Sequence, residues 1–172
     1  MAETDYSKYI IKEPLAIGRF SPIVHICGEK HRFGNGDCPG SIFPDFPVEQ
    51  TLMYITEPFL MNTPTHAHDY DQLLYVLGGN PANFFDFDAE IELTLGDRGE
   101  KHSVNTTSIV YIPKGMMHCP VNFKRIDKPI MFGHLSFAPE YSRSSGDRTE
   151  DTPIYDTYPE EEIARLKKGG TC

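Results

Sequence analysis

Ala89-Glu90-Ile91-Glu92-Leu93-Thr94-Leu95 decides the fold class, because apolar and polar residues alternate along its whole length. Side chains of a β-strand point to opposite faces in turn, so this pattern predicts a strand with one buried face. The next four residues, Gly96-Asp97-Arg98-Gly99, have the composition of a turn, and the chain then returns through residues 101–104. The stretch therefore predicts an antiparallel hairpin.

Similar short runs, each bounded by turn-forming residues, occur on both sides of this hairpin. Pro113 ends one run, and Asp127-Lys128-Pro129 separates the last two. Many short antiparallel strands with frequent turns are typical of a sandwich or a barrel, so we expect an all-β fold. The further expected strands are residues 51–61, 72–77, 108–112, 122–126 and 130–137.

The composition fits one soluble globular domain. The chain has 172 residues, of which 39% are hydrophobic, and this length can bury a core without disulfides or structural metals. The 14 Gly and 14 Pro favour short strands and turns over long helices. The formal charge of −9 argues against nucleic acid and anionic membranes as partners, since both require basic surfaces.

The sequence also predicts a cytoplasmic location. No apolar run approaches the length of a membrane span, and residues 1–5 are acidic rather than the basic start of a signal peptide. The four cysteines show no repeated spacing and no Cys-x-x-Cys pair, which favours reduced, structural thiols.

Three regions are expected along the chain. Residues 1–20 form an N-terminal arm, residues 21–138 carry the strand signals, and residues 139–172 form a tail of different composition. A short helix is expected over residues 159–169, because Pro and acidic residues open that segment, basic residues close it and Gly follows.

Two short segments offer a set of metal ligands. His66 and His68 are two residues apart, so on a strand they point to the same face. Gln72 follows close behind them, and His118 comes after a Pro-x-Gly corner that can turn its side chain inward. Three imidazoles and a carboxamide oxygen suit one divalent ion, and the candidate metals are iron, manganese, nickel, cobalt and zinc.

These segments resemble the two motifs of the cupin family. The first motif runs Gly, His-x-His, Glu and Gly, and here His66, His68, Gln72 and Gly79 stand in register with it. The second motif runs Gly, Pro-x-Gly-x-x-His and Asn, and its matches are Pro113, Gly115, His118 and Asn122. The resemblance implies a jelly-roll β-barrel with the arm and the helical tail attached, and a homodimer.

The chain departs from the family pattern at three motif positions. Leu60 and Thr107 replace the leading glycines, which affects local turns only. Gln72 replaces the acidic ligand, so a bound ion keeps its full charge and acts as a stronger Lewis acid. The loop of residues 80–87, which is rich in aromatic residues, is expected to wall the mouth of the pocket.

Several of these residues have a second interpretation. Gln72 either ligates the ion or forms hydrogen bonds inside the barrel, in which case Asp69, Asp71 or water ligates. Cys119 is expected to be a buried thiol rather than a ligand. His134 is either an acid or base of the cavity or a structural histidine. Tyr54 and Asn62 share the parity of His66, so they point inward if that strand is unbroken.

The leading functional hypothesis is a metal-dependent enzyme that acts on a small oxygen-bearing organic molecule. Lyase, isomerase or decarboxylase chemistry suits the neutral Gln72, with His66, His68 and His118 as the other ligands and Tyr54 or His134 moving protons. One alternative is a non-haem iron(II) dioxygenase, in which three histidines leave positions for oxygen and substrate. The other is a non-catalytic sensor whose metal anchors a small effector. The sequence does not identify the substrate.

Overall fold

The computed structural model of the chain describes residues 7–10, 16–17, 22–27, 32–33, 36–37, 41–43, 46–61, 64–139, 156–157 and 160–168. These residues form a 3-10 helix, fourteen strands and one α-helix. The elements are η1 (Ser7–Tyr9), β1 (Ala16–Ile17), β2 (Pro22–Cys27), β3 (Arg32–Phe33), β4 (Gly36–Asp37), β5 (Ser41–Ile42), β6 (Glu49–Ile55), β7 (Phe59–Met61), β8 (Gln72–Leu77), β9 (Ala89–Leu95), β10 (Glu100–Val104), β11 (Ser108–Ile112), β12 (His118–Ile126), β13 (Ile130–Ser136), β14 (Asp156–Thr157) and α1 (Glu160–Lys167).

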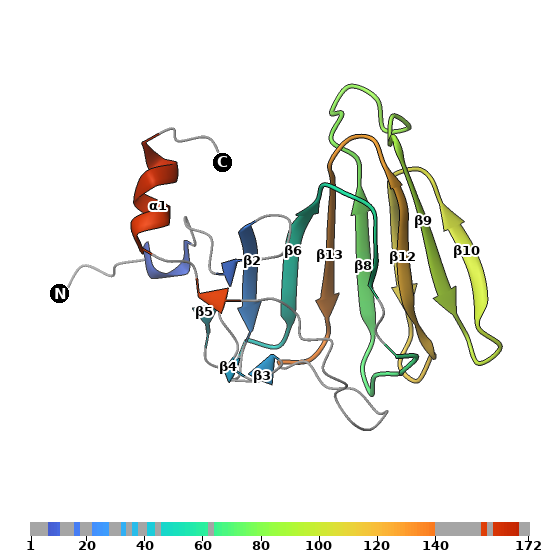
Figure 1. Ribbon diagram of the computed structural model, residues 1–172. Helices are drawn as coiled ribbons and strands as arrows, with labels where there is room; N and C mark the ends of the chain where they lie inside the picture. The colour runs from blue at the N-terminus through green and yellow to red at the C-terminus, as the bar shows by residue number, and fades with distance from the viewer. Residues whose placement is uncertain are drawn as a thin grey trace.

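The predicted all-β fold is confirmed, and its strands form two main sheets (Figure 1). The larger sheet has the strand order β11-β8-β13-β6-β2-β1-β14, with β5 paired to β2, and the smaller has the order β10-β9-β12-β7. Strands β3 and β4 form a separate pair. Within the described residues the two main sheets are not joined into one closed barrel.

Alternation along the strands brings apolar side chains between the two sheets. The burial pattern of β9 matches its sequence, with Ala89, Ile91 and Leu93 buried. Phe123 of the smaller sheet stacks on Phe59 at a centroid distance of 4.8 Å and meets Phe132 of the larger sheet edge-on at 5.1 Å. Each buried Phe contributes about 1.5–3 kcal/mol of hydrophobic stabilisation, so this core holds the two sheets together.

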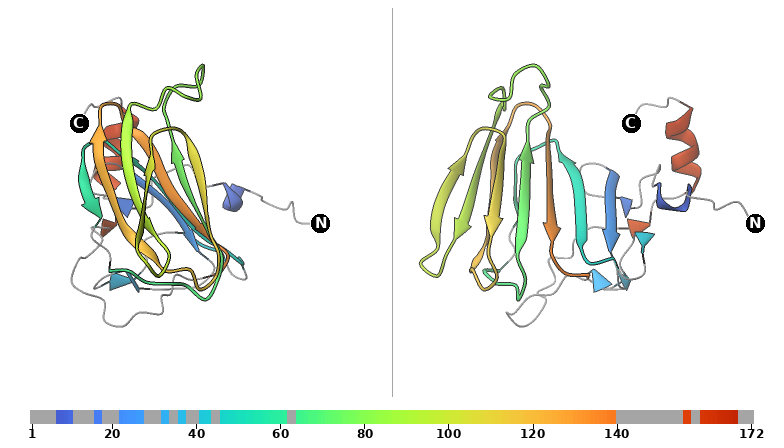
Figure 2. Two further views of the ribbon diagram at one scale, coloured as in Figure 1. Left: turned by 90° about the vertical axis from the view of Figure 1, so that its right-hand side faces the viewer. Right: turned by 180° about the vertical axis from the view of Figure 1, so that it is seen from behind.

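The arm and the tail extend one edge of the larger sheet. Ala16 of β1 pairs with Ile23 of β2 on one side and with Thr157 of β14 on the other. Helix α1 lies beyond this edge, at the opposite end of the molecule from β10 (Figure 1 and the right-hand view of Figure 2). No helix in the described part of the chain is long and apolar enough to cross a membrane.

Five of the seven expected strands match the structure to within one residue at each end, and one is divided. The expected strand 51–61 consists of β6 and β7, separated at residues 56–58, where Pro58 cannot donate to a sheet. The interruption breaks the parity on which Tyr54 was expected to face inward. Strand β12 begins four residues before the expected strand and passes through a bulge at residues 119–120.

Candidate metal centre

The two histidine segments are joined directly by backbone hydrogen bonds. The amide of His66 donates to the carbonyl of His118 at 3.1 Å, and the amide of His118 donates to the carbonyl of His66 at 2.9 Å. Gly115, which has a φ of 80°, donates its amide to the carbonyl of His68 at 2.8 Å. A glycine suits this corner because other residues rarely adopt positive φ. These bonds fix the spacing of the three histidines without a regular strand at residues 64–70.

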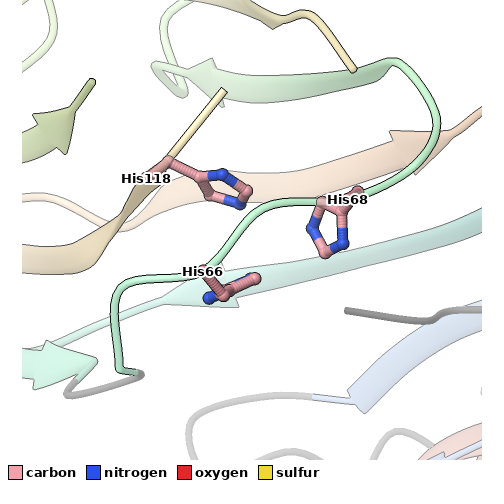
Figure 3. A group of neighbouring side chains, drawn as sticks. All are labelled: His66, His68 and His118. Carbon is pink, nitrogen blue, oxygen red and sulfur yellow. The ribbon is translucent and has the colours of Figure 1, made fainter. Parts of the chain in front are cut away.

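The three imidazole rings converge on one point inside the protein (Figure 3). His66, His68 and His118 are 1%, 3% and 3% exposed, and their candidate ligand nitrogens all lie within 4.8 Å of one another. The centroid distances of the three ring pairs are 4.9, 4.4 and 4.9 Å, so the rings form a nearly equilateral triangle. Among the described residues this is the group of His, Cys, Asp and Glu side chains whose geometry suits a metal ion.

Local contacts prepare the three rings as ligands. Nδ1 of His66 lies 2.7 Å from the carbonyl oxygen of Pro64, and Nδ1 of His118 lies 3.0 Å from that of Met116. Each Nδ1–H donates to its carbonyl, which leaves the lone pair on Nε2 for a metal. The ring of His68 stacks on the buried ring of Tyr70 at 4.8 Å, with an angle of 8° between the planes.

The electrostatics of His118 also favour the neutral, metal-binding form. Burial lowers the pKa of His118 from its ordinary value, and the hydrogen bond with Met116 offsets this only in part. A metal requires the neutral imidazole, so a lowered pKa reduces competition from protons. Three buried imidazoles form a donor set that fits a divalent transition metal.

Gln72 is the first residue of β8 and is 3% exposed. Its Nε2 donates to the hydroxyl of Ser136 on the neighbouring strand β13, at 3.1 Å. An amide that donates through its nitrogen keeps its oxygen as an acceptor or ligand, so both interpretations of Gln72 remain compatible with this contact.

The two aspartates considered as substitutes for Gln72 lie outside the centre. Asp69 is exposed. Oδ1 of Asp71 accepts a hydrogen bond from the Tyr111 hydroxyl at 3.1 Å and another from the Lys114 amide at 2.8 Å. The bond to Asp71 also raises the pKa of Tyr111. Asp71 therefore forms hydrogen bonds both to strand β11 and to the loop that precedes β12.

Of the two residues expected to move protons, the structure brings His134 to the inner face and leaves Tyr54 outside. Tyr54 is 50% exposed, because the inward positions of β6 are those of Glu49, Thr51 and Ile55. His134 lies opposite Thr51 in the register of β13 and β6, so it shares that inner face. Asn62 lies outside the described residues.

Two other expectations concern Cys119 and the aromatic loop. Cys119 is 9% exposed and packs within the hydrophobic core. The loop of residues 80–87 lies between the end of β8 and the start of β9. Gln72 is the first residue of β8, and His118 pairs with Leu95, the last residue of β9, so both lie at the opposite ends of these strands. The loop therefore does not wall the pocket at the histidines, and Phe84 and Phe85 are exposed. A hollow of about 410 Å³ beside this loop is likewise remote from the centre.

The sequence analysis missed Glu49, Thr51 and Ser136, which are buried polar residues near His134. Each is 0% exposed, and Glu49 is ion-paired to His134. A signal was present, since Glu49 and Thr51 continue the inward parity of Ile55. The expected strand began at residue 51, so it omitted Glu49.

The solved structures that are similar to this chain include cupins. No family model matches the chain, and no curated protein matches it. A cupin superfamily protein from Desulfitobacterium hafniense is 11% identical, with 79% of this chain and 91% of that chain covered and a TM-score of 0.40. An RmlC-like cupin with a double-stranded β-helix fold from Methanocaldococcus jannaschii is 22% identical, with 54% and 70% covered and a TM-score of 0.38.

The matched structures also include enzymes. The DMSP lyase DddQ from Ruegeria pomeroyi is 17% identical, with a TM-score of 0.37 over 55% of this chain and 40% of that chain. An oxalate decarboxylase is 16% identical, with a TM-score of 0.40 over 58% and 24%.

Proposed function

We propose that the protein is a metal-dependent enzyme of the cupin type that acts on a small oxygen-bearing organic molecule. The observation that carries the proposal is the triangle of buried imidazoles, whose ligand nitrogens lie within 4.8 Å of one another. A divalent ion at this centre would polarise a carbonyl or carboxylate oxygen and stabilise the negative charge that develops on it. Four residues are proposed to hold the ion: His66, His68, His118 and Gln72.

We propose lyase, isomerase or decarboxylase chemistry rather than oxidation. With three neutral imidazoles and a neutral carboxamide, no ligand charge would reduce the Lewis acidity of the ion. The neutral set also gives little support to a higher oxidation state. In this proposal His134, on the inner face of the larger sheet, moves the proton that the reaction requires.

The test is turnover of a panel of small hydroxy acids, oxo acids and β-dicarbonyl compounds by protein loaded with one metal at a time. Products are followed by NMR with oxygen excluded, and then with oxygen present in an oxygen electrode. The proposal predicts product without oxygen, and none from a variant with all three histidines replaced by Ala. Product only with oxygen uptake would favour the dioxygenase, and binding without turnover would favour the sensor.

We also propose that the chain pairs with a second copy and acts in the cytoplasm. The outer face of the larger sheet supports the pairing, because Tyr54, Ile109 and Tyr111 are 50–62% exposed there. By contrast, the outer face of the smaller sheet carries ion pairs of Glu92 with Lys101 and Lys124.

Sedimentation of Ile109→Lys should show a shift toward monomer, whereas Thr94→Lys on the charged face should sediment as wild type. Identical sedimentation of all three would contradict this pairing.

A further inference from the structure

A buried ion pair lies on the inner face of the larger sheet. Nε2 of His134 is 3.0 Å and 2.8 Å from the two carboxylate oxygens of Glu49, and the Thr51 hydroxyl donates to Oε1 of Glu49 at 3.2 Å. The side chain of Glu49 is 0% exposed and that of His134 is 16% exposed. Buried ion pairs contribute little net stability, because desolvation costs offset their attraction. A buried pair on the inner face of a sheet therefore points to a chemical role rather than to stability alone.

The strand register places this pair beside the candidate metal centre. Ser136 of β13 lies opposite both Glu49 of β6 and Gln72 of β8, and Gln72 donates to its hydroxyl at 3.1 Å. His134 lies opposite Leu74, the next inward position after Gln72. Diagonal neighbours of this kind are about 7–8 Å apart, so His134 and the fourth motif residue line the same part of the interior.

The contact between Glu49 and His134 determines which ring nitrogen exchanges a proton. A carboxylate accepts only from N–H, so Glu49 holds a proton on Nε2. The proton that His134 gains or loses is then the one on Nδ1. This carboxylate–imidazole arrangement fixes the tautomer and the orientation of a histidine that performs acid–base chemistry.

We propose that Glu49 positions His134 as the general acid of the pocket, which transfers its Nδ1 proton to an oxygen of the bound small molecule. The Nδ1–H bond breaks and an O–H bond forms, while the electron pair stays on Nδ1 and the other proton stays on Nε2, hydrogen-bonded to the Glu49 carboxylate. The inference rests on the proposed function, since it assigns a role at the same site. His134 is a catalytic residue in this assignment, and Glu49 is a positioning residue.

The electrostatics of the pair support the acid form of His134. Burial alone would lower the pKa of His134. The charge of Glu49 and the hydrogen bond to it together raise the pKa by more than burial lowers it, so the net shift is upward. The other buried titratable groups among the described residues are His66, His68, His118, Tyr70 and Cys119. The inward positions of β8 carry Gln72, Leu74 and Val76, none of which titrates.

The experiment uses the full chain loaded with cobalt(II) and azide as the probe. Azide affinity is measured from the visible spectrum of the cobalt between about pH 6 and pH 9. If His134 donates a proton to the bound anion, wild-type affinity should fall by about tenfold for each pH unit above the His134 pKa. Glu49→Gln should move this fall to lower pH, and His134→Gln should remove the His134-linked part of the profile.

A matched control and a second measurement keep the result decisive. Glu92→Gln, which removes a carboxylate from the charged outer face, should leave the azide profile unchanged. Histidine NMR of the wild-type protein should show His134 with its proton on Nε2 and broadened by cobalt, even if a Glu49 variant fails to fold. A profile identical in wild type and His134→Gln would overturn the inference, and absence of cobalt binding by wild type would overturn the proposed function instead.

Discussion

The imidazoles of His66 and His118 become metal ligands through single hydrogen bonds to the backbone. In each, Nδ1 bonds a carbonyl two residues earlier in the chain, so Nε2 is presented to the interior. His68 is oriented differently, by stacking on Tyr70. The spacing of the histidines was visible in the sequence, whereas these orienting contacts depend on backbone conformations at Pro64 and Met116 that no motif encodes.

A prediction at this scale concerns the fourth motif residue. Gln72→Glu should bind metal at least as tightly as wild type, because a carboxylate is the stronger ligand, and the Ser136 hydroxyl can reverse its bond and donate to it. The added negative charge should weaken Lewis-acid catalysis. Metal competition against a chelator measures the first effect, and turnover measures the second. A variant with unchanged affinity and unchanged turnover would make Gln72 a bystander.

The stability of the protein should depend on pH through His134. Its pKa is raised in the folded state, where the Glu49 charge and hydrogen bond outweigh burial, and is about 6.5 in the unfolded chain. The contribution of the pair is therefore complete below the unfolded pKa and is lost as pH rises through the folded pKa.

The comparison that tests this dependence is between wild type and His134→Gln. Their difference in free energy of unfolding should be largest near pH 6 and should shrink toward pH 9. Urea unfolding at a series of pH values measures it, and a difference that stays constant with pH would contradict the assigned shift.

At the scale of single elements, the contact between β13 and β6 is unusually close at Gly133. A Cβ at this position would lie 2.3 Å from the Thr51 carbonyl oxygen and 2.6 Å from Cδ2 of Leu52. Any side chain would push the two strands apart and disturb the neighbouring pair of His134 and Glu49.

Gly133→Ala should therefore lower the free energy of unfolding by about 1–3 kcal/mol, which is typical of overpacking. Gly79→Ala is the matched control, because the nearest atom to its added Cβ, the Pro129 carbonyl oxygen, is 3.6 Å away. Denaturant unfolding of both variants measures the effect. Equal stabilities would show that the strands adjust without cost.

The strands were predictable where one rule dominated the sequence. Residues 89–95, 108–112 and 72–77 have the predicted bounds, because alternation and breakers agree in each. The interruption after Ile55 was not predicted, although Pro58 was visible, because apolar residues continue beyond it. Glu49 was missed for a related reason, since a charged residue at an inward position contradicts the apolar pattern that defines a strand.

At the scale of the whole molecule, the hydrophobic core is separate from the histidine centre. Phe59, Phe123 and Phe132 hold the two sheets together, and none of the three histidines belongs to the core cluster. The fold should therefore not require a metal, unlike small zinc domains.

Removal of metal by a chelator should lower Tm without abolishing the β-type circular dichroism spectrum. Each kcal/mol of lost binding free energy corresponds to a decrease in Tm of about 2–4 °C for a chain of this size. Thermal unfolding followed by circular dichroism, with and without chelator, measures both quantities. A coil spectrum after chelation at room temperature would make the centre structural.

The measurement that tests the central claim most directly is the metal content of purified protein, determined by elemental analysis without a metal-chelating tag. If His66, His68 and His118 hold one ion, wild type should contain about one equivalent of a divalent transition metal per chain. Each single replacement by Ala should lower that content, and replacement of all three should abolish it while circular dichroism remains that of a folded β protein. A folded triple variant with the full metal content of wild type would contradict the account.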